Sequence, residues 1–458
     1  MFPVAIDHDV DATDRTRPTV DRTAETTLWS SGHYPRPVTL PDRSGLSRRD
    51  YLRALVGVGG ATALSACVSE SDDVDVPTGT DDPESLPARQ HAWNDVLSVD
   101  ADGNVLPPEH HVLVALSLST EPTDDARATV EESLRSLERA YEWSNEGLVF
   151  TLGYTPAYFD RFGEDLPDEV GLPDPGPITG DADAFDEFDA LLHLASDRSQ
   201  VVLEAEEGLF GDHDELNGIE VETELSGVFD RIDDGRRTGF VGEGLPAEHT
   251  DVDGVPDSIP DEAPFFMGFR SGFDRNQATE NRVTIEEGAF AGATTQHVSS
   301  MGINLRQWFE QDSHPMRIGK LFSPAHADDD LVGDVGEKLE TSNAVTDDLV
   351  EATEDDARSR GVVGHAQKAA RARDDGEPVL LRRDFNTVDG DRPGVHFVSL
   401  QHDVEEFVRV REAMEGDDLG VTDLNNGIRG YLFVDRRGNY LLPPRSLRAL
   451  PPANPDAN

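Results

Sequence analysis

The chain contains a single cysteine, Cys67, among 458 residues. One thiol cannot form a disulfide within the chain, and without a cysteine pair the usual ligand spacings of a structural zinc site are missing. The histidines include no His-x-x-x-His pair, and the sequence has no Gly-rich phosphate loop and no nucleophile elbow. These absences argue against a zinc enzyme, a P-loop nucleotide-binding protein and an α/β-hydrolase.

Positive charge is also scarce, because 39 Lys and Arg residues oppose 92 Asp and Glu residues, for a formal net charge of −53. Only Lys320, Lys338 and Lys368 are lysines. So acidic a chain repels nucleic acid and anionic lipid, and neither is expected as a partner. The acidic residues alternate with apolar segments, which favours a folded protein with an acidic surface over a disordered tail. Its self-repulsion is tolerable where salt is molar and the Debye length is about 3 Å, so we expect a halophilic protein.

An uncharged segment at residues 54–66 is rich in glycine and too short to cross a bilayer. It follows twin arginines, Arg48 and Arg49, and is followed by Cys67 in the sequence Leu-Ser-Ala-Cys. The first feature resembles a Tat export signal, and the second resembles the lipobox of lipoproteins, in which the cysteine is lipidated. Together they predict an extracellular protein anchored by lipid to the outer face of the cell membrane. The alternative is a buried N-terminal helix with an incidental cysteine.

The remaining chain shows two similar successions of strands and helices. In the first half, apolar runs at 112–118, 147–153 and 189–197 predict strands, and helices are expected at 122–141 and 200–209. In the second half, strands are expected at 290–299, 379–385 and 395–400, with helices at 302–311 and 403–414. This order is typical of a ferredoxin-like α+β unit present twice. The predicted regions are a disordered extension (1–42), the export signal (43–67), a flexible tether (68–92), two halves (93–260 and 261–445) and a tail (446–458).

The second half contains the residues with the most specific chemistry. His365 follows Gly364, which leaves room beside the ring, and Arg382 ends the apolar run 378–381. A neutral imidazole can ligate haem iron, and a permanently charged guanidinium in the same cavity can stabilise the anion left when a peroxide O–O bond breaks. The alternative is a hydrogen-bonded structural histidine and a solvated pair of arginines beside an aspartate.

Five segments of the chain resemble the dye-decolorizing (DyP-type) haem peroxidases over about residues 100–440. They are the segments 147–163 (GLVFTLGYTPAYFDRFG), 189–197 (DALLHLASD) and 264–272 (PFFMGFRSG), His365 with the strand that ends in Arg382, and 394–403 (GVHFVSLQHD). The resemblance implies a duplicated ferredoxin-like fold of the dimeric α+β barrel type and haem b as the cofactor.

The resemblance also implies roles for individual residues. His365 would be the axial ligand of the haem iron, and Asp403 is a candidate to hold its second ring nitrogen. Arg382 would be the distal arginine, with Arg383 as the alternative. Gly268, Arg270 and Gly272 would lie beside the cofactor, with Arg270 next to a propionate. Trp308 and Tyr431 would either pass electrons from a bulky donor or belong to the core.

The chain departs from the family in the loop 268–272. The family has Gly-x-x-Asp-Gly there, whereas this chain has Ser271 in the position of the distal aspartate. A hydroxyl cannot transfer protons as a carboxylate of suitable pKa does. Arg382 alone would then support slower peroxide cleavage, Asp274 would replace the missing carboxylate, or the protein would bind haem without turnover. The alternative interpretation of the loop 268–272 is a tight turn between two glycines that binds no ligand.

The function that these features predict is a haem-dependent peroxidase that reduces hydrogen peroxide with an organic or metal electron donor, weakened by the change at Ser271. The alternative is a non-catalytic haem- or iron-binding surface lipoprotein of the same fold. A structural lipoprotein without a cofactor is the third interpretation. Association into a homo-oligomer is compatible with each of them.

Overall fold

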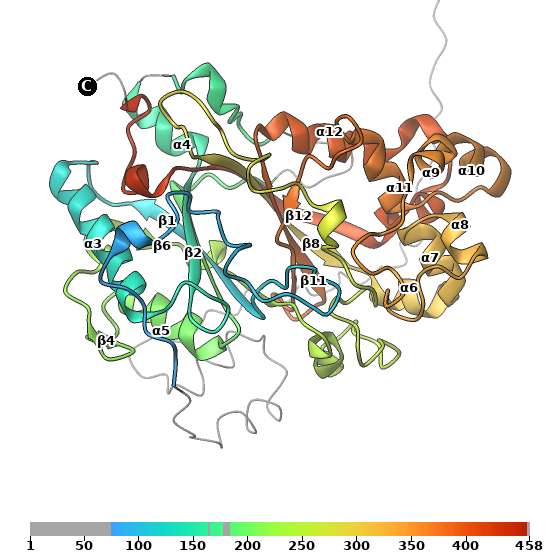
Figure 1. The fold of residues 1–458 in the computed structure, drawn as a ribbon, viewed down its shortest axis with the longest axis horizontal. Helices are drawn as coiled ribbons and strands as arrows, with labels where there is room; N and C mark the ends of the chain where they lie inside the picture. Colours follow the sequence, from blue (N-terminus) through green and yellow to red (C-terminus); the bar gives the residue numbers. More distant parts are fainter. Residues whose placement is uncertain (1–74, 164, 177–183, 456–458) are drawn as a thin grey trace, which may run out of the picture. The chain divides into compact units, whose positions relative to one another are not determined.

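The computed structural model of the protein describes residues 75–163, 165–176 and 184–455 (Figure 1). The predicted extension at 1–42 and the export signal with Arg48, Arg49 and Cys67 lie outside these residues, so both stay predictions. Within the described part of the chain, no helix is long and apolar enough to cross a membrane.

The first half forms a four-stranded antiparallel arrangement in the order β7-β1-β3-β2. Its first helix begins where the sequence predicts, because the Thr123 hydroxyl accepts a hydrogen bond from the Ala126 amide and two aspartates follow in the first turn. Strand β1 is buried almost throughout, because its alternate side chains belong to two different clusters of buried residues, one on each face of the sheet. The elements are β1 (His110–Leu118), α3 (Asp124–Ala140), β2 (Val149–Tyr154), α4 (Pro156–Phe159), β3 (Ala190–Ser196), α5 (Ser199–Leu209), β6 (Phe229–Arg231) and β7 (Arg237–Phe240), with a separate hairpin of β4 (Glu215–Leu216) and β5 (Ile219–Glu220).

The second half repeats this plan in the order β12-β8-β11-β9. A group of short helices is inserted between its first helix and its second strand, and Figure 1 shows them gathered beside β8 and β11. The elements are β8 (Thr294–Ile303), α6 (Leu305–Gln311), α7 (His314–Leu321), α8 (Pro324–Asp328), α9 (Asp347–Glu351), α10 (Thr353–Arg360), α11 (His365–Ala369), β9 (Leu381–Arg382), β10 (Phe385–Thr387), β11 (Gly394–Gln401), α12 (Val404–Glu415) and β12 (Leu432–Leu442).

Two joints connect the halves into one ten-stranded sheet. At the first joint, β2 pairs with β12 through Tyr154 and Leu441. At the second, the short strand β10 pairs with β11 and also reaches β7 through Asn386 and Phe240. The sheet therefore closes on itself, and the prediction of an α+β fold built from two ferredoxin-like units is confirmed.

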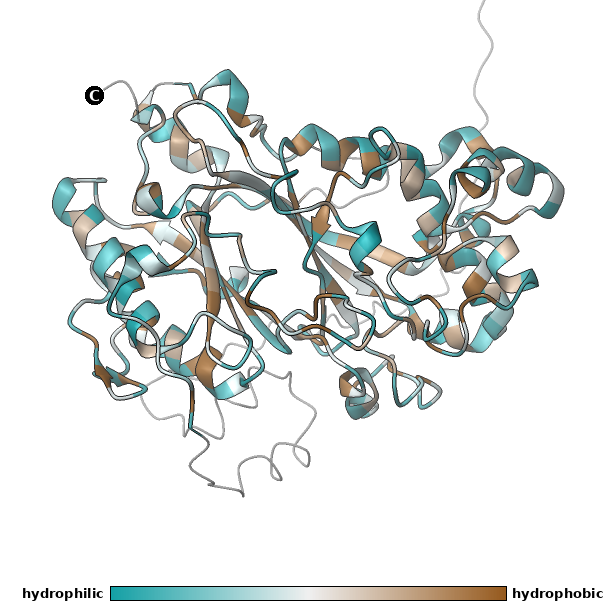
Figure 2. Ribbon diagram, in the orientation of Figure 1, coloured by the Kyte–Doolittle hydropathy of each residue, from teal (hydrophilic) through white to brown (hydrophobic). Residues whose placement is uncertain are grey.

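The apolar core follows from this closure. One cluster of buried residues fills the space between the first-half strands and the helices α3 and α5. A second cluster lies around α6, α7 and the loop that precedes β8. Figure 2 shows the matching distribution, with apolar residues along the strands and polar residues on the outward sides of the helices.

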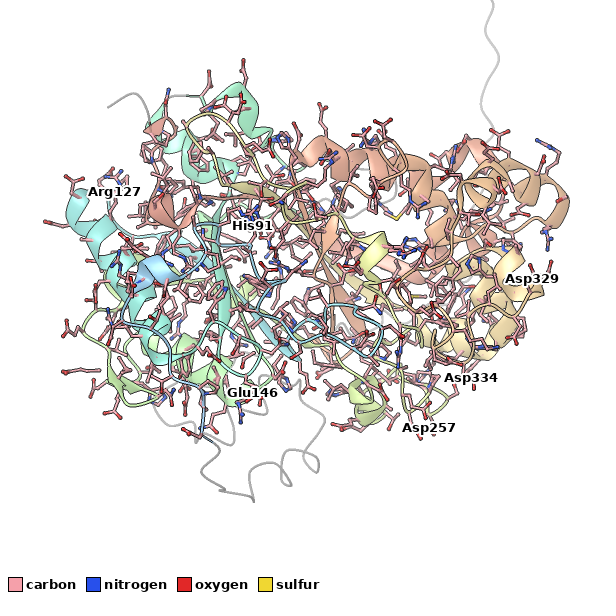
Figure 3. The ribbon with its side chains drawn as sticks, in the orientation of Figure 1. His91, Arg127, Glu146, Asp257, Asp329 and Asp334 are labelled. Carbon is pink, nitrogen blue, oxygen red and sulfur yellow. The ribbon has the colours of Figure 1, made fainter. Side chains whose placement is uncertain are left out.

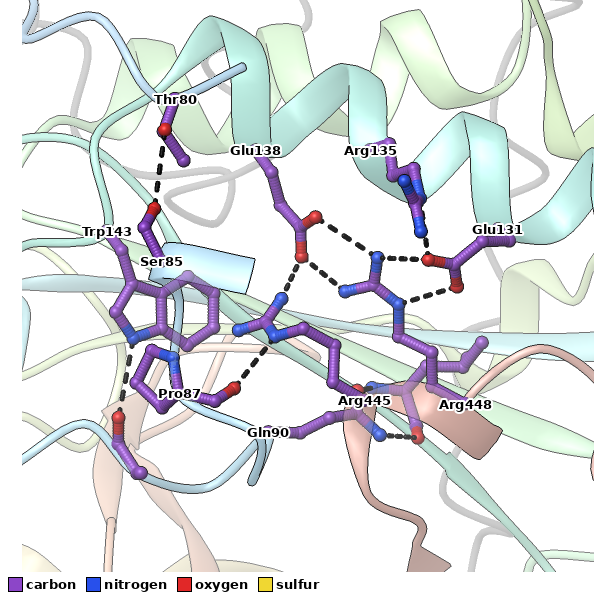
Figure 4. A network of polar contacts seen from close by, with 12 residues as sticks. Thr80, Ser85, Pro87, Gln90, Glu131, Arg135, Glu138, Trp143, Arg445 and Arg448 are labelled. Carbon is purple, nitrogen blue, oxygen red and sulfur yellow. Dashed lines mark hydrogen bonds and ion pairs between the residues drawn. The ribbon is translucent and has the colours of Figure 1, made fainter. Parts of the chain in front are cut away.

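The ends of the described chain are packed against the first half more closely than the sequence predicts. Arg448 is buried and binds two carboxylates of α3, donating from Nε to Glu131 Oε2 at 3.0 Å and pairing with Glu138 (Figure 4). Arg445 also pairs with Glu138, and its Nε donates to the Pro87 carbonyl at 2.9 Å. A hydrogen bond from Arg445 thus holds the chain at Pro87, in the region predicted as a tether, and buried ion pairs hold Arg448, in the region predicted as a tail.

The acidic residues lie mainly at the surface. Figure 3 labels four of them, Glu146, Asp257, Asp329 and Asp334, at the periphery of the molecule, and all four are exposed. Lowering the salt from molar to about 0.1 M lengthens the Debye length from about 3 Å to about 10 Å, so repulsion between such groups extends further. We expect the melting temperature to fall on this change, as measured by circular dichroism.

Sucrose is the control for this salt prediction, because it stabilises proteins by exclusion from their surface and does not screen charge. Adding sucrose at low salt should restore only part of the lost stability. Equal melting temperatures in molar and 0.1 M salt would contradict the prediction.

Candidate functional site

A cavity in the second half brings the predicted site residues together. Its empty volume is about 1430 Å³, counting the part open to solvent, and His365, Arg382, Ser271 and Arg270 all line it. Much of its wall is apolar and aromatic, with side chains that include Phe266, Phe269, Phe273, Met301, Phe397 and Phe407.

His365 is the first residue of α11, and the chain before it is held in place. The Gln367 amide donates to the Phe322 carbonyl at 3.2 Å, and the Gln367 side-chain oxygen accepts from the Gly364 amide at 3.2 Å. A Cβ at Gly364 would lie 1.8 Å from the Phe322 carbonyl oxygen, so only glycine allows this close approach. The helix start thereby fixes the direction from which His365 enters the cavity.

The His365 imidazole is neutral at physiological pH. Burial lowers its pKa to about 3, and the nearby cations Lys368 and Arg382 act in the same direction. Among the described residues, none forms a hydrogen bond with either ring nitrogen. A neutral ring with an uncommitted nitrogen is the form that ligates a metal.

Arg382 is the last residue of β9, and Gln277 clamps its backbone. The Gln277 side chain accepts from the Arg382 amide and donates to the Arg382 carbonyl, both at 3.1 Å. At the other end of the side chain, Nη1 lies 3.4 Å from the Ser271 hydroxyl oxygen, to which it donates. The same Nη1 lies 3.7 Å from Asp384 Oδ2. The guanidinium therefore lies between a hydroxyl and a carboxylate.

Asp384 is a titratable residue of the cavity that the sequence interpretation missed. It lines the cavity and is half-buried, with 13% of its side chain exposed, and its Oδ1 accepts a hydrogen bond from the Val398 amide at 3.1 Å. Burial raises its pKa to about 6, although Arg382 acts in the opposite direction. The available signal was the spacing, because side chains two residues apart in an extended segment lie on the same face as each other.

The other candidates from the sequence lie elsewhere. Arg383 does not line the cavity with His365; its Nη2 donates to the His91 carbonyl at 2.7 Å and to Glu280 at 3.1 Å, and it stacks on Trp93. Asp403 was expected to hold the His365 ring, but its carboxylate caps α12 by accepting from the Glu405 amide at 2.7 Å. That expectation is wrong.

The loop 268–272 forms a turn in which both glycines have positive φ, 87° at Gly268 and 79° at Gly272. Gly268 lines neither this cavity nor the one next to it, whereas Gly272 lines the neighbouring cavity only. The Arg270 amide donates to the Val335 carbonyl at 2.7 Å, which fixes the loop, and the Arg270 side chain reaches both cavities.

The two aromatic residues considered for electron transfer are core residues. Trp308 and Tyr431 are buried with ring centroids 5.0 Å apart, and neither lines the cavity. The Trp308 indole donates to the Met267 carbonyl at 2.9 Å, and the Tyr431 hydroxyl donates to Asp312. Their hydrogen bonds are therefore satisfied within the protein.

The charge of the cavity wall is opposite to that of the chain as a whole. Asp384 is the only carboxylate among the described residues that line it, and six basic side chains line it as well, one of which, Lys368, has its pKa lowered to about 7 by burial. These are Arg270, Lys368, Arg382, Arg411, Arg429 and Arg437. Arg411 and Arg429 both pair with Glu415, at 2.6 and 2.7 Å, but this carboxylate does not line the cavity. Such a wall favours a ligand that carries negative charge.

A second cavity adjoins the first. Its empty volume is about 1730 Å³, again counting the open part, and several carboxylates line it, including Asp100, Glu109 and Asp274. Arg382, Asp384, Ser271 and Arg270 line both cavities. These four polar residues therefore lie at the boundary between a cationic and an acidic space.

Solved structures of dye-decolorizing peroxidases are similar to this chain at low sequence identity. The dye-decolorizing protein from Vibrio cholerae is 15% identical with a TM-score of 0.47, covering 78% of this chain and 98% of its own. DyPB from Rhodococcus jostii RHA1 is 16% identical with a TM-score of 0.49, covering 79% of this chain and 98% of its own. The putative DyP-type peroxidase from Shewanella oneidensis is 14% identical with a TM-score of 0.47, covering 75% and 94%. No curated protein matches the chain.

A family model matches the chain from residue 108 to residue 444. The match spans both ferredoxin-like units and includes His365, Arg382, Asp384 and Ser271. The chain therefore belongs to the family described as a family of unknown function, DUF7405.

Proposed function

We propose that the protein is a haem-dependent peroxidase of the DyP type, which reduces hydrogen peroxide with an organic or metal electron donor. The observation that carries the proposal is the cavity that contains both the neutral imidazole of His365 and the guanidinium of Arg382. The sequence at 48–49 and 64–67 supports a second part of the proposal, in which the protein is exported by the Tat route and anchored through Cys67.

The residues of the cavity fit haem b in three respects. His365 provides a neutral imidazole nitrogen, which is one of the axial ligands that hold haem iron in proteins. The aromatic wall suits a flat apolar macrocycle, and the cationic side chains suit the carboxylates at its edge. Arg270 is the candidate for one of these carboxylates, because it reaches the cavity from the loop 268–272. Bound haem would supply the iron centre that passes electrons from the donor to the peroxide.

The protein's own contribution is to bind and orient the peroxide. The Arg382 guanidinium donates hydrogen bonds to a peroxide oxygen and stabilises the negative charge that develops there. The Ser271 hydroxyl accepts from Arg382, and the Gln277 clamp holds the strand behind it. In the complete reaction, one hydrogen peroxide takes up two electrons from the donor and two protons, and two waters leave.

The experiment is a haem titration of the full chain in molar salt, followed by the Soret band. We expect uptake of one haem per chain and loss of the ligand-dependent spectrum in His365→Ala, with partial recovery when imidazole is added. His402→Ala is the matched control, because His402 lies outside the cavity, and it should behave as the unchanged protein. A spectrum that is identical in His365→Ala and in the unchanged protein would overturn the proposed ligand.

A second candidate function is haem or iron binding without turnover. It is favoured by Ser271, which puts a hydroxyl where the resemblance places a carboxylate, and by the lack of a hydrogen-bonded partner for the His365 ring among the described residues. Oxidation of a dye by haem-loaded protein and hydrogen peroxide separates the two functions. Haem uptake without dye oxidation would assign the binding function instead.

A further inference from the structure

The boundary between the two cavities contains a carboxylate for which the proposed function gives no role. We propose that Asp384 is the proton-accepting residue of the peroxide site, supplied by the short segment between β9 and β10 in place of a carboxylate from the loop 268–272. This inference rests on the proposed function and extends it. It replaces Asp274 as the candidate for that role, since Asp274 lines the second cavity but not the one that contains His365.

The two oxygens of Asp384 have different surroundings: Oδ1 is held by a backbone hydrogen bond, and Oδ2 faces the Arg382 guanidinium. Oδ1 accepts from the Val398 amide of β11 at 3.1 Å, which fixes the plane of the carboxylate. Oδ2 lies 3.7 Å from Arg382 Nη1, a distance longer than a direct hydrogen bond. A small oxygen species such as water or peroxide that lies to one side of the pair can hydrogen-bond to both groups. The carboxylate and the guanidinium thus have space to bind the same molecule.

Arg382 and Ser271 extend this arrangement into a chain of three polar groups. Arg382 Nη1 lies between the Ser271 hydroxyl at 3.4 Å and Asp384 Oδ2 at 3.7 Å, and all three residues line both cavities. The acidic second cavity lies next to them and gives Asp384 access to a space from which a proton can be exchanged. Asp384 is also the only carboxylate among the described residues lining the first cavity.

The proposed step is a proton transfer. An O–H bond of hydrogen peroxide breaks, the proton forms a new O–H bond at Asp384 Oδ2, and the resulting HOO⁻ keeps the electron pair. Its negative charge is stabilised by the Arg382 guanidinium. No electron changes hands in this step. The proton then returns to the oxygen that leaves as water.

The environment of Asp384 suits both accepting and returning a proton. Burial raises its pKa to about 6; the facing charge is Arg382, which lowers it, and β11 contributes the uncharged Val398 amide. A general base works best when its pKa lies near the operating pH. Because the pKa is raised, the proton-accepting carboxylate form is lost as the pH falls through about 6 and is fully present above it.

The test compares the full haem-loaded chain with Asp384→Asn, which keeps Oδ1 as an acceptor for the Val398 amide. Hydrogen cyanide is the probe, because it must lose a proton to bind iron as the anion and its association is read from the Soret band without turnover. We expect Asp384→Asn to slow cyanide association and peroxide consumption by about 10²-fold or more and to remove the rise in rate through pH 6.

Two further variants make the test specific. Adding Ser271→Asp to Asp384→Asn supplies a carboxylate next to Arg382 from the other side and should restore part of both rates. Asp274→Asn is the matched control and should leave them unchanged. If Asp384→Asn takes up haem normally and its rates are unchanged, the role proposed for Asp384 is overturned, whereas the proposed haem-dependent function is not. Absence of haem uptake by the unchanged chain would overturn the proposed function, and this inference with it.

Discussion

Replacing Arg382 with leucine is expected to lower kcat/KM for hydrogen peroxide by about 10²- to 10³-fold, the usual cost of removing a donor that stabilises developing negative charge. The Arg382 guanidinium lines the cavity with His365 and lies between Ser271 and Asp384, so no other side chain occupies the same position. Five further cations line the cavity, and haem uptake should therefore change little.

The pH profile of Arg382→Leu provides an independent readout. Arg382 lowers the pKa of Asp384 against the effect of burial, so its removal should raise that pKa and shift the rise in peroxide consumption to higher pH. Stopped-flow absorbance in the Soret region measures both the rate and its pH dependence.

Two controls distinguish position from charge in this experiment. Arg382→Lys keeps the charge but loses the planar fork of donors, and it should recover only part of the rate. Arg409→Leu removes a cation from the exposed face of α12 and should have no effect. A rate in Arg382→Leu within a factor of three of the unchanged protein would contradict the role of Arg382.

Replacing Glu138 with glutamine is expected to destabilise the protein by about 3–5 kcal/mol, the usual cost of removing one partner of a buried ion pair. Glu138 is 4% exposed, and both Arg445 and Arg448 bind its carboxylate. Burial and the neighbouring Arg448 already lower the pKa of Arg445 to about 9, which shows how poorly this site tolerates positive charge. Without the Glu138 charge, the guanidiniums of Arg445 and Arg448 would stay close together with less negative charge to balance them (Figure 4).

Guanidinium unfolding followed by circular dichroism in molar salt measures this loss. Glu132→Gln is the matched control on the same helix, because its pair with Arg139 is partly exposed and should contribute at most about 1 kcal/mol. Equal destabilisation by the two variants would show that burial of Glu138 does not govern the effect. The loss should also loosen the C-terminal segment, since Arg445 and Arg448 both belong to it.

Local patterns in the sequence were enough for the secondary structure and for part of the site. The apolar run at 112–118 corresponds to β1, and the helical spacing of Val130, Leu134 and Leu137 corresponds to the buried face of α3. Both patterns record which side chains leave water, and that depends on residues close together in the chain. The chemistry of His365 and Arg382 also suggested that both belong to one cavity, which they do.

The role proposed for Asp384 could not come from local pattern. An aspartate after two arginines is usually solvated, and its raised pKa arises only because the folded chain buries it. The sequence also did not predict the cationic wall of the cavity. Its side chains are spread along the chain from Arg270 to Arg437, and no single one of them is distinguished by its sequence context. Only their convergence on one cavity makes them a site.

The sequence by itself therefore determined the α+β class, the repeated order of elements and the identity of the two groups with the most specific chemistry. Tertiary structure alone decided how the sheet closes through β10, which arginine enters the cavity and which carboxylate lies beside it. The reason is physical: strand and helix formation depend on near neighbours, whereas burial, pKa and charge at a site depend on segments more than a hundred residues apart, such as Ser271 and Arg382.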